Sequence, residues 1–260
     1  MVSQISIIAG RGRDGRCDRI ERLDLNMGDV VSVVGRTGSG KTTLINDIEL
    51  FADGDTPTGR RILFDGVPAA PEDRDDPSRN PIALITQHTT FLSDLPVTEF
   101  LVTHARIRAR SQAAAQALVA ETLMFANQLT GEPINPGSRM TELSGGQTRA
   151  LLIADATVIC DTPIVLLDEV ENAGINRTRA LELLRRHKRI FIFVTHDPRI
   201  ALLSDRRIVM SEGRITDVLE TDEEEQAVAP AVTRLDDMLS HLRERLRGGL
   251  RVSRADLEVA

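Results

Sequence analysis

A run of glycines beside a lysine and two threonines offers the clearest chemistry in this sequence. It follows the apolar stretch 30–34 and precedes a helix-like segment, 42–52. A strand, then G-x-x-x-x-G-K-T, then a helix is typical of a phosphate-binding loop, whose backbone N–H groups and helix N-terminus attract anions. We expect Lys41 to reach the β- and γ-phosphates and Thr42 to ligate Mg²⁺. The sequence thus predicts a nucleoside triphosphate site formed by Gly35, Arg36, Thr37, Gly38, Ser39, Gly40, Lys41, Thr42 and Thr43.

Four predicted strands each end where a polar or glycine-rich motif begins. They end at Val34, Ile85, Leu167 and Val194. Because these strands alternate with helices, they predict a mostly parallel sheet that binds its ligand at the carboxyl ends of the strands. The predicted fold class is α/β, with a P-loop NTPase core, an N-terminal antiparallel β sub-domain and an inserted α-helical sub-domain. The polar residues after the last three strand ends are Gln87, Asp168, Glu169 and His196.

A second motif, Leu143-Ser144-Gly145-Gly146-Gln147, precedes a helix and then the acidic strand end. With this motif, residues 1 to about 216 resemble the ATP-binding-cassette (ABC) family of ATPases. The family's motifs occur here in its order: the phosphate loop at 35–42, a Q-loop glutamine at Gln87, a helical sub-domain, the LSGGQ signature at 143–147, Walker B at 164–168 with Glu169, and a switch histidine at His196. Six motifs at compatible spacings make the resemblance highly specific.

The resemblance implies a role for each polar side chain. Asp168 would hold Mg²⁺ with Thr42, and Gln87 would touch the Mg²⁺ or its water. Glu169 would polarise the attacking water, although a solvated strand-end charge is its alternative. His196 would hydrogen-bond the γ-phosphate, although a lone histidine is more often structural. With ATP and Mg²⁺ as cofactors, the implied reaction is phosphoryl transfer to water, with the catalytic set Glu169, His196, Gln87 and Lys41.

The signature implies that the chain works as a dimer. By resemblance, its residues would contact the γ-phosphate bound to a partner subunit, so two copies would sandwich two ATP molecules head to tail. A helix N-terminus, which is an anion site, lies at this motif. The predicted contacts are Ser144, Gly145, Gly146 and Gln147.

Three departures from the family pattern indicate an outlying branch. The segment 9–16 holds no aromatic residue to stack on adenine, so Arg11 or Arg13 would stack its guanidinium plane there instead. The loop 170–176 differs from the family's usual sequence, which would alter communication across the dimer. The helix after the signature carries Ala150 and Asp155 where two arginines are usual.

Composition narrows the function class. The chain has 39 acidic and 32 basic residues and a net charge of −7, which disfavours general nucleic-acid binding. Neither a signal peptide nor an apolar run as long as a membrane span is present, so we expect a cytoplasmic protein, either free or peripheral on the cytosolic face of the membrane. The two cysteines, Cys17 and Cys160, lie far apart and show no metal-ligand spacing, which favours a reducing compartment.

The chain divides into three predicted parts. Residues 1–97 and 144–216 form the ATPase core, 98–143 a helical sub-domain ending in the signature motif, and 217–260 an acidic linker and C-terminal helix. Four leucines recur at 4-3-4 spacing in the last part, as in an amphipathic helix. We favour a helix packed on its own domain over a dimerising or partner-docking helix; the leucines are Leu235, Leu239, Leu242 and Leu246.

Two functions remain open. The first is the cytosolic motor of a membrane transporter, paired with itself or a related ABC subunit and docked on a permease near Gln87 and the helical block. The alternative is a soluble ABC ATPase that remodels, assembles or reactivates a partner metallo- or cofactor-enzyme, which the altered loop, the missing aromatic and the acidic tail favour. DNA-repair or chromosome-organising clamps would need long coiled-coil insertions or basic grooves, and the sequence has neither.

Overall fold

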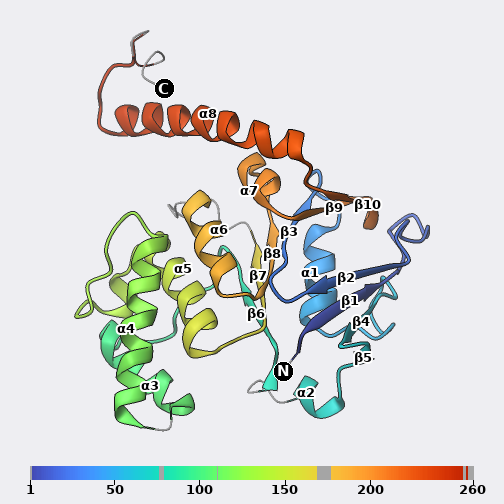
Figure 1. The fold of residues 1–260 in the computed structure, drawn as a ribbon, viewed down its shortest axis with the longest axis horizontal. Helices are drawn as coiled ribbons and strands as arrows, with labels where there is room; N and C mark the ends of the chain where they lie inside the picture. The colour runs from blue at the N-terminus through green and yellow to red at the C-terminus, as the bar shows by residue number, and fades with distance from the viewer. Residues whose placement is uncertain (1, 76–78, 110, 169–176, 254–255, 257–260) are drawn as a thin grey trace.

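A six-stranded sheet lies at the centre of the molecule (Figure 1). The computed structural model of the 260-residue chain describes residues 2–75, 79–109, 111–168, 177–253 and 256. The strand order is β10-β9-β3-β8-β7-β6, in which β10 pairs antiparallel with β9 and all other neighbours are parallel. The strands are β3 (Val30–Val34), β6 (Ile82–Ile85), β7 (Ile164–Asp168), β8 (Ile190–Val194), β9 (Arg206–Ser211) and β10 (Arg214–Glu220).

The central strands are buried on both faces, as their unbroken apolar sequences predict. In β7, Val165 and Leu167 pack in the core on the helical side of the sheet. Ile164 and Leu166 pack in the core on the opposite side, which includes α1 (Lys41–Glu49). Because successive side chains point to opposite faces, a slip of one residue would exchange the two cores and is therefore disfavoured.

A smaller antiparallel sheet covers one side of the large sheet. Its order is β2-β1-β4-β5, with β1 (Gln4–Ile8), β2 (Arg22–Asn26), β4 (Arg61–Phe64) and β5 (Val67–Pro68). Ile5 and Ile7 of β1 enter the shared core, and Ser6 between them donates to Asp24 Oδ1 on β2 at 2.5 Å. The predicted α/β fold with an N-terminal antiparallel region is confirmed.

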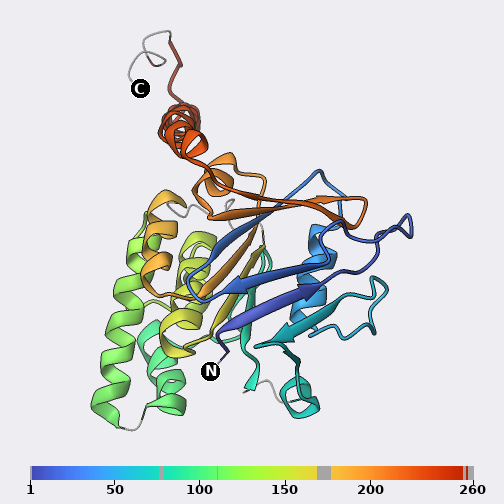
Figure 2. The same ribbon diagram turned by 45° about the vertical axis from the view of Figure 1, so that its right-hand side comes forward.

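Helices cover the other face of the large sheet. α3 (Val97–Arg108), α4 (Gln112–Leu129), α5 (Gly145–Ala154) and α6 (Arg177–Arg186) lie together there, on the side away from α1 (Figures 1 and 2). Ser111 caps α4, since its side chain accepts the Ala114 N–H at 3.1 Å. The helical insertion is thus confirmed. The helix α5 and the turn after it, which the sequence assigned to the core, pack against α3 and α4, and from here on the helical sub-domain includes them. The shorter helices are α2 (Pro71–Asp75), α7 (Pro198–Leu203) and the 3₁₀ turn Met140–Glu142.

The acidic stretch predicted as a linker from 217 is instead regular structure. Residues 217–220 complete β10, and α8 (Glu223–Arg247) starts soon afterwards. The acidic side chains are placed beside basic ones, because Glu220 lies opposite Arg206 in the β9–β10 ladder and Glu225 forms an ion pair with Arg207. Cross-strand pairing of opposite charges stabilises an edge strand, which a count of acidic residues does not reveal.

The helix α8 contacts its own domain, as the favoured interpretation expected, but not through the leucine stripe. Leu235, Leu239 and Leu246 are 61%, 49% and 63% exposed. α8 instead meets α7, where Arg199 lies 2.7 Å from Asp236. Ion pairs to Arg199 and Arg207, together with the buried Ala229, therefore hold α8 in place of the leucine stripe. Among the described residues, no helix combines the length and apolarity needed to cross a membrane.

Candidate functional site

The loop between β3 and α1 has a backbone that only glycine accommodates at two points. Gly40 has φ +99°, and a Cβ added there would lie 2.6 Å from the Cα of Gly213. At Gly35 an added Cβ would lie 2.4 Å from the Met210 carbonyl oxygen. Both contacts are with the β9–β10 hairpin, and the Gly213 N–H also donates to the Ser39 carbonyl at 2.8 Å. The β9–β10 hairpin therefore packs directly against the backbone of the phosphate loop.

The inside of this loop is polar and positively charged. Lys41 is buried, and its Nζ donates to the Gly35 carbonyl at 2.9 Å and to the Arg36 carbonyl at 3.3 Å. The Ser39 hydroxyl is buried and has no hydrogen-bond partner among the residues that the structure describes. No acidic residue lies in the first turn of α1, so its N-terminal dipole is not neutralised locally. Such a loop is suited to a phosphate chain.

The sheet places two further predicted groups beside the loop. Asp168 of β7 is level with Val194 of β8, which is level with Val33 of β3. At about 4.8 Å per strand, the end of β7 lies about 10 Å from the start of the phosphate loop. His196 follows β8, the strand between them, and is exposed.

Oxygen donors gather at this edge of the sheet. The exposed Thr42 lies in the first turn of α1, Asp168 ends β7, and the exposed Gln87 lies in the turn after β6. Hydroxyl, carboxylate and amide oxygens are the ligands that Mg²⁺ prefers, so this donor set fits that ion. Glu169 and the loop 170–176 lie outside the described residues.

Gln87 is joined to the helical sub-domain by a residue that the sequence did not single out. The Arg149 guanidinium of α5 donates to the Gln87 carbonyl at 2.7 Å. α5 begins at the signature motif, so one hydrogen bond connects the sheet edge to the signature helix. Its position two residues after the signature motif is the one feature of the sequence that could have drawn attention to Arg149.

The signature motif forms the N-terminus of α5. Ser144 caps it, accepting the Gln147 N–H at 3.3 Å, and the Gln147 side chain accepts the Ser144 N–H at 3.0 Å. Gln147 also donates to the Pro133 carbonyl at 3.0 Å. The Gln147 side chain is thus committed to this capping box and to the preceding loop, whereas Ser144 and Gly145 are exposed.

The arginines predicted to stack on adenine lie on a turn that contacts the β9–β10 hairpin, next to the phosphate loop. Arg11 and Arg13 are exposed, and the Arg13 N–H donates to the Glu212 carbonyl at 3.0 Å. The next residue, Gly213, contacts Gly40 of the phosphate loop. Gly213 was not predicted as a site residue, although a glycine between two strand-like segments indicates a turn.

A buried ion cluster lies behind these elements. Arg60 is fully buried; its guanidinium donates to Asp18 at 2.8 Å, to Asp47 at 3.0 Å and to the Gly213 carbonyl at 2.7 Å. Burial alone would raise the pKa of Asp18, but hydrogen bonds from Arg60 and from the N–H groups of Gly10 and Ile215 hold it below its usual 3.8. The cluster joins the N-terminal region, α1 and the β9–β10 hairpin.

Comparison with known sequences agrees with this geometry. The ABC transporter family matches residues 20–172. An uncharacterized ABC transporter ATP-binding protein of Methanocaldococcus jannaschii is 43% identical over 258 residues, covering 99% of this chain and 98% of the relative. The lipoprotein-releasing system ATP-binding protein LolD of Bordetella pertussis is 30% identical over 203 residues, covering 74% and 84%.

Solved structures show the same fold. cbiO1 from Clostridium perfringens, part of the ABC transporter complex cbiONQ, aligns with a TM-score of 0.66 at 21% identity, over 92% of this chain and 100% of that one. The ATP-binding cassette MJ0796, in a dimeric post-hydrolysis state bound to ADP and Pi, aligns with a TM-score of 0.63 at 21% identity, over 84% and 99%.

Proposed function

This chain belongs to the ABC transporter family as an ATP-binding cassette with ABC-type ATPase activity, and we propose that it is the motor subunit of a membrane transporter. The observation that carries the proposal is the bond from Arg149 to Gln87, which joins the sheet edge to the helix of the signature motif. Relatives that act in a lipoprotein-releasing system and in a cbiONQ complex add support.

The motor would act by closing a head-to-tail dimer around ATP. Ser144 and Gly145 are exposed at a helix N-terminus, where a phosphate from a second copy can approach. Lys41 would neutralise the phosphates inside the loop, and Glu169 would orient the attacking water. Thr42, Asp168 and Gln87 would hold Mg²⁺, which when bound neutralises charge that develops on the phosphates.

The permease would contact the segment 88–96, between β6 and α3. Leu92 is fully exposed there, while the neighbouring Phe91 packs edge-on against Phe100 of α3 with ring centroids 5.1 Å apart. Asp94 accepts from Arg139 at 2.5 Å and from Thr141 at 2.6 Å, which anchors the segment. An exposed leucine on an anchored loop beside Gln87 is suited to transmit movement to an apolar partner surface.

One pair of substitutions tests this assignment. Leu92→Glu places a charge at the proposed contact, and Val67→Glu places the same charge at another solvent-exposed apolar side chain, on β5, that is 61% exposed. Both variants would be expressed in the native cell in place of the wild-type chain, and their distribution between membrane and soluble fractions would be measured together with the proteins that co-purify.

We expect the wild-type chain and Val67→Glu to co-purify with a polytopic membrane protein, and Leu92→Glu to lose it while hydrolysing ATP. A wild-type chain that stays in the soluble fraction bound to another enzyme would contradict the transporter proposal. That result would favour the soluble remodelling ATPase.

A further inference from the structure

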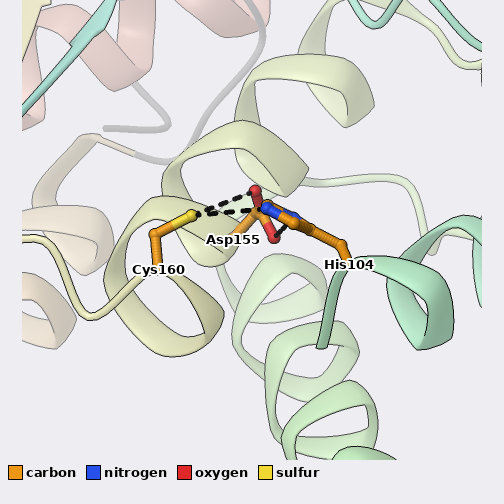
Figure 3. Close-up of side chains that lie close together, drawn as sticks. All are labelled: His104, Asp155 and Cys160. Atoms are coloured by element: carbon orange, nitrogen blue, oxygen red, sulfur yellow. Dashed lines mark hydrogen bonds and ion pairs between the residues drawn. The ribbon is translucent and has the colours of Figure 1, made fainter. Parts of the chain in front are cut away.

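Three side chains that bind metals in many proteins converge in the helical sub-domain (Figure 3). His104 lies on α3, Asp155 begins the π-helical turn Asp155–Ile159 after α5, and Cys160 follows that turn. His104 Nδ1 lies 2.9 Å from Asp155 Oδ1, and Cys160 Sγ lies 3.8 Å from His104 Nε2 and 3.7 Å from Asp155 Oδ2. One ligand atom from each residue lies within 4.8 Å of the other two.

The π-helical turn is what brings Asp155 and Cys160 to the same side. In an α-helix, side chains five residues apart point about 140° away from each other. Here the Cys160 N–H donates to the Asp155 carbonyl at 2.9 Å, which closes the wider π turn, and both side chains face His104 (Figure 3). π turns are rare and occur frequently at functional sites.

The donor chemistry selects the ion. A thiolate, an imidazole and a carboxylate together suit Zn²⁺, whereas Mg²⁺ and Ca²⁺ prefer oxygen ligands alone. With Zn–S of about 2.3 Å and Zn–N or Zn–O of about 2.0–2.2 Å, a tetrahedral site has ligand–ligand distances of about 3.3–3.6 Å. Cys160 Sγ lies 3.8 Å from His104 Nε2 and 3.7 Å from Asp155 Oδ2, close to that range, and one ligand atom of each residue lies within 4.8 Å of the other two, so side-chain rotations would complete the site.

The site is also accessible. The His104 side chain is 30% exposed and the Asp155 side chain 11%, so an ion can enter and water can supply a fourth ligand. We propose that His104, Asp155 and Cys160 bind Zn²⁺ and that the ion joins α3 to the end of α5. Because α5 begins at the signature motif, the ion would hold the two helices of this sub-domain in one arrangement.

Zinc binding by the untagged, full-length chain tests the proposal. The chain is stripped with a chelator, dialysed and titrated with Zn²⁺ alone, and bound metal is counted by elemental analysis. Co²⁺ serves as a second probe, since a sulfur ligand gives it a charge-transfer absorption band. The variants are His104→Ala, Asp155→Asn and Cys160→Ser. Cys17→Ser is the matched control, because Cys17 is the other cysteine of the chain and is exposed.

We expect one Zn²⁺ per chain in the wild type and in Cys17→Ser. In the three site variants the affinity should fall at least about the 10- to 100-fold that loss of an outer-shell partner produces. The Co²⁺–sulfur band should disappear in Cys160→Ser. Nucleotide binding by each variant shows that it has folded. Absence of bound zinc in the wild type, or zinc binding that survives Cys160→Ser, would overturn the proposal.

Discussion

Arg60→Met should be among the most destabilising single substitutions in this chain. It removes a guanidinium that is 0% exposed and leaves the carboxylates of Asp18 and Asp47, 0% and 3% exposed, without their cation. Removing one partner of a buried ion pair costs about 3–5 kcal/mol. At roughly 2–4 °C per kcal/mol for a chain of this size, the melting temperature should fall by roughly 6–20 °C. Methionine fills most of the arginine's volume, so cavity formation contributes little.

The adjacent residue supplies the control. Arg61 pairs with Asp53 at 2.8 Å, but the two side chains are 50% and 36% exposed, and such surface pairs contribute about 0–1 kcal/mol. Thermal and urea unfolding of Arg60→Met and Arg61→Met should therefore differ by several kcal/mol. Equal loss of stability in the two variants would refute the reasoning.

The same pair of chains gives a pH test of the cause. In the wild type the folded-state pKa of Asp18 is lowered, so this group contributes stability above about pH 3.8 that is lost as the pH falls through its folded-state pKa. Without Arg60, burial should raise the pKa of Asp18, and protonation then relieves the unpaired charge. The stability difference between wild type and Arg60→Met should narrow as the pH falls towards 4.

Further predictions concern nucleotide binding, pH and the C-terminal helix. Lys41→Ala should weaken ATP binding by about 10- to 150-fold, measured by calorimetry, because a charged hydrogen bond of about 1.5–3 kcal/mol is lost; unchanged affinity would refute the loop assignment. Burial against Phe125 lowers the pKa of His187, so its contribution to stability should fall as the pH drops below about 6.5, and His187→Phe should remove that dependence. Deleting residues 223–260 should leave ATP hydrolysis intact, since α8 supplies none of the residues placed at the nucleotide site; loss of hydrolysis would place α8 in the core.

Patterns of neighbouring residues were enough to predict the phosphate loop, the helix at the signature motif and the strands of the large sheet. The β3–loop–α1 order, the start of a helix at the signature motif and the alternating strands each follow from residues close together in sequence. Parallel strands then bring Asp168 and His196 to one edge because topology, not sequence distance, decides what lies there.

Contacts between residues far apart in the sequence could not be predicted from such patterns. Arg60 and Asp18 are 42 residues apart, and nothing near either predicts that both are buried. Asp155 was noted only as a departure from the family's arginine, and Cys160 as a cysteine without metal spacing. Asp155 and Cys160 lie close to His104 because of a π turn and because of the way α3 packs. Neither feature produces a recognisable repeat of residue types in the sequence. The burial of paired polar groups is decided by tertiary structure.

The central claim is that ATP closes a head-to-tail dimer of this chain, and the mass of Glu169→Gln in solution tests it most directly. With Mg²⁺ and ATP this variant should bind without turnover, and its mass by light scattering should double relative to the ADP state. Adding Ser144→Asp should abolish the doubling, because aspartate preserves the helix cap but repels the partner's γ-phosphate; Ser144→Thr, which keeps both cap and hydroxyl, should preserve it. A monomer under all conditions, or a dimer indifferent to Ser144→Asp, would contradict the account.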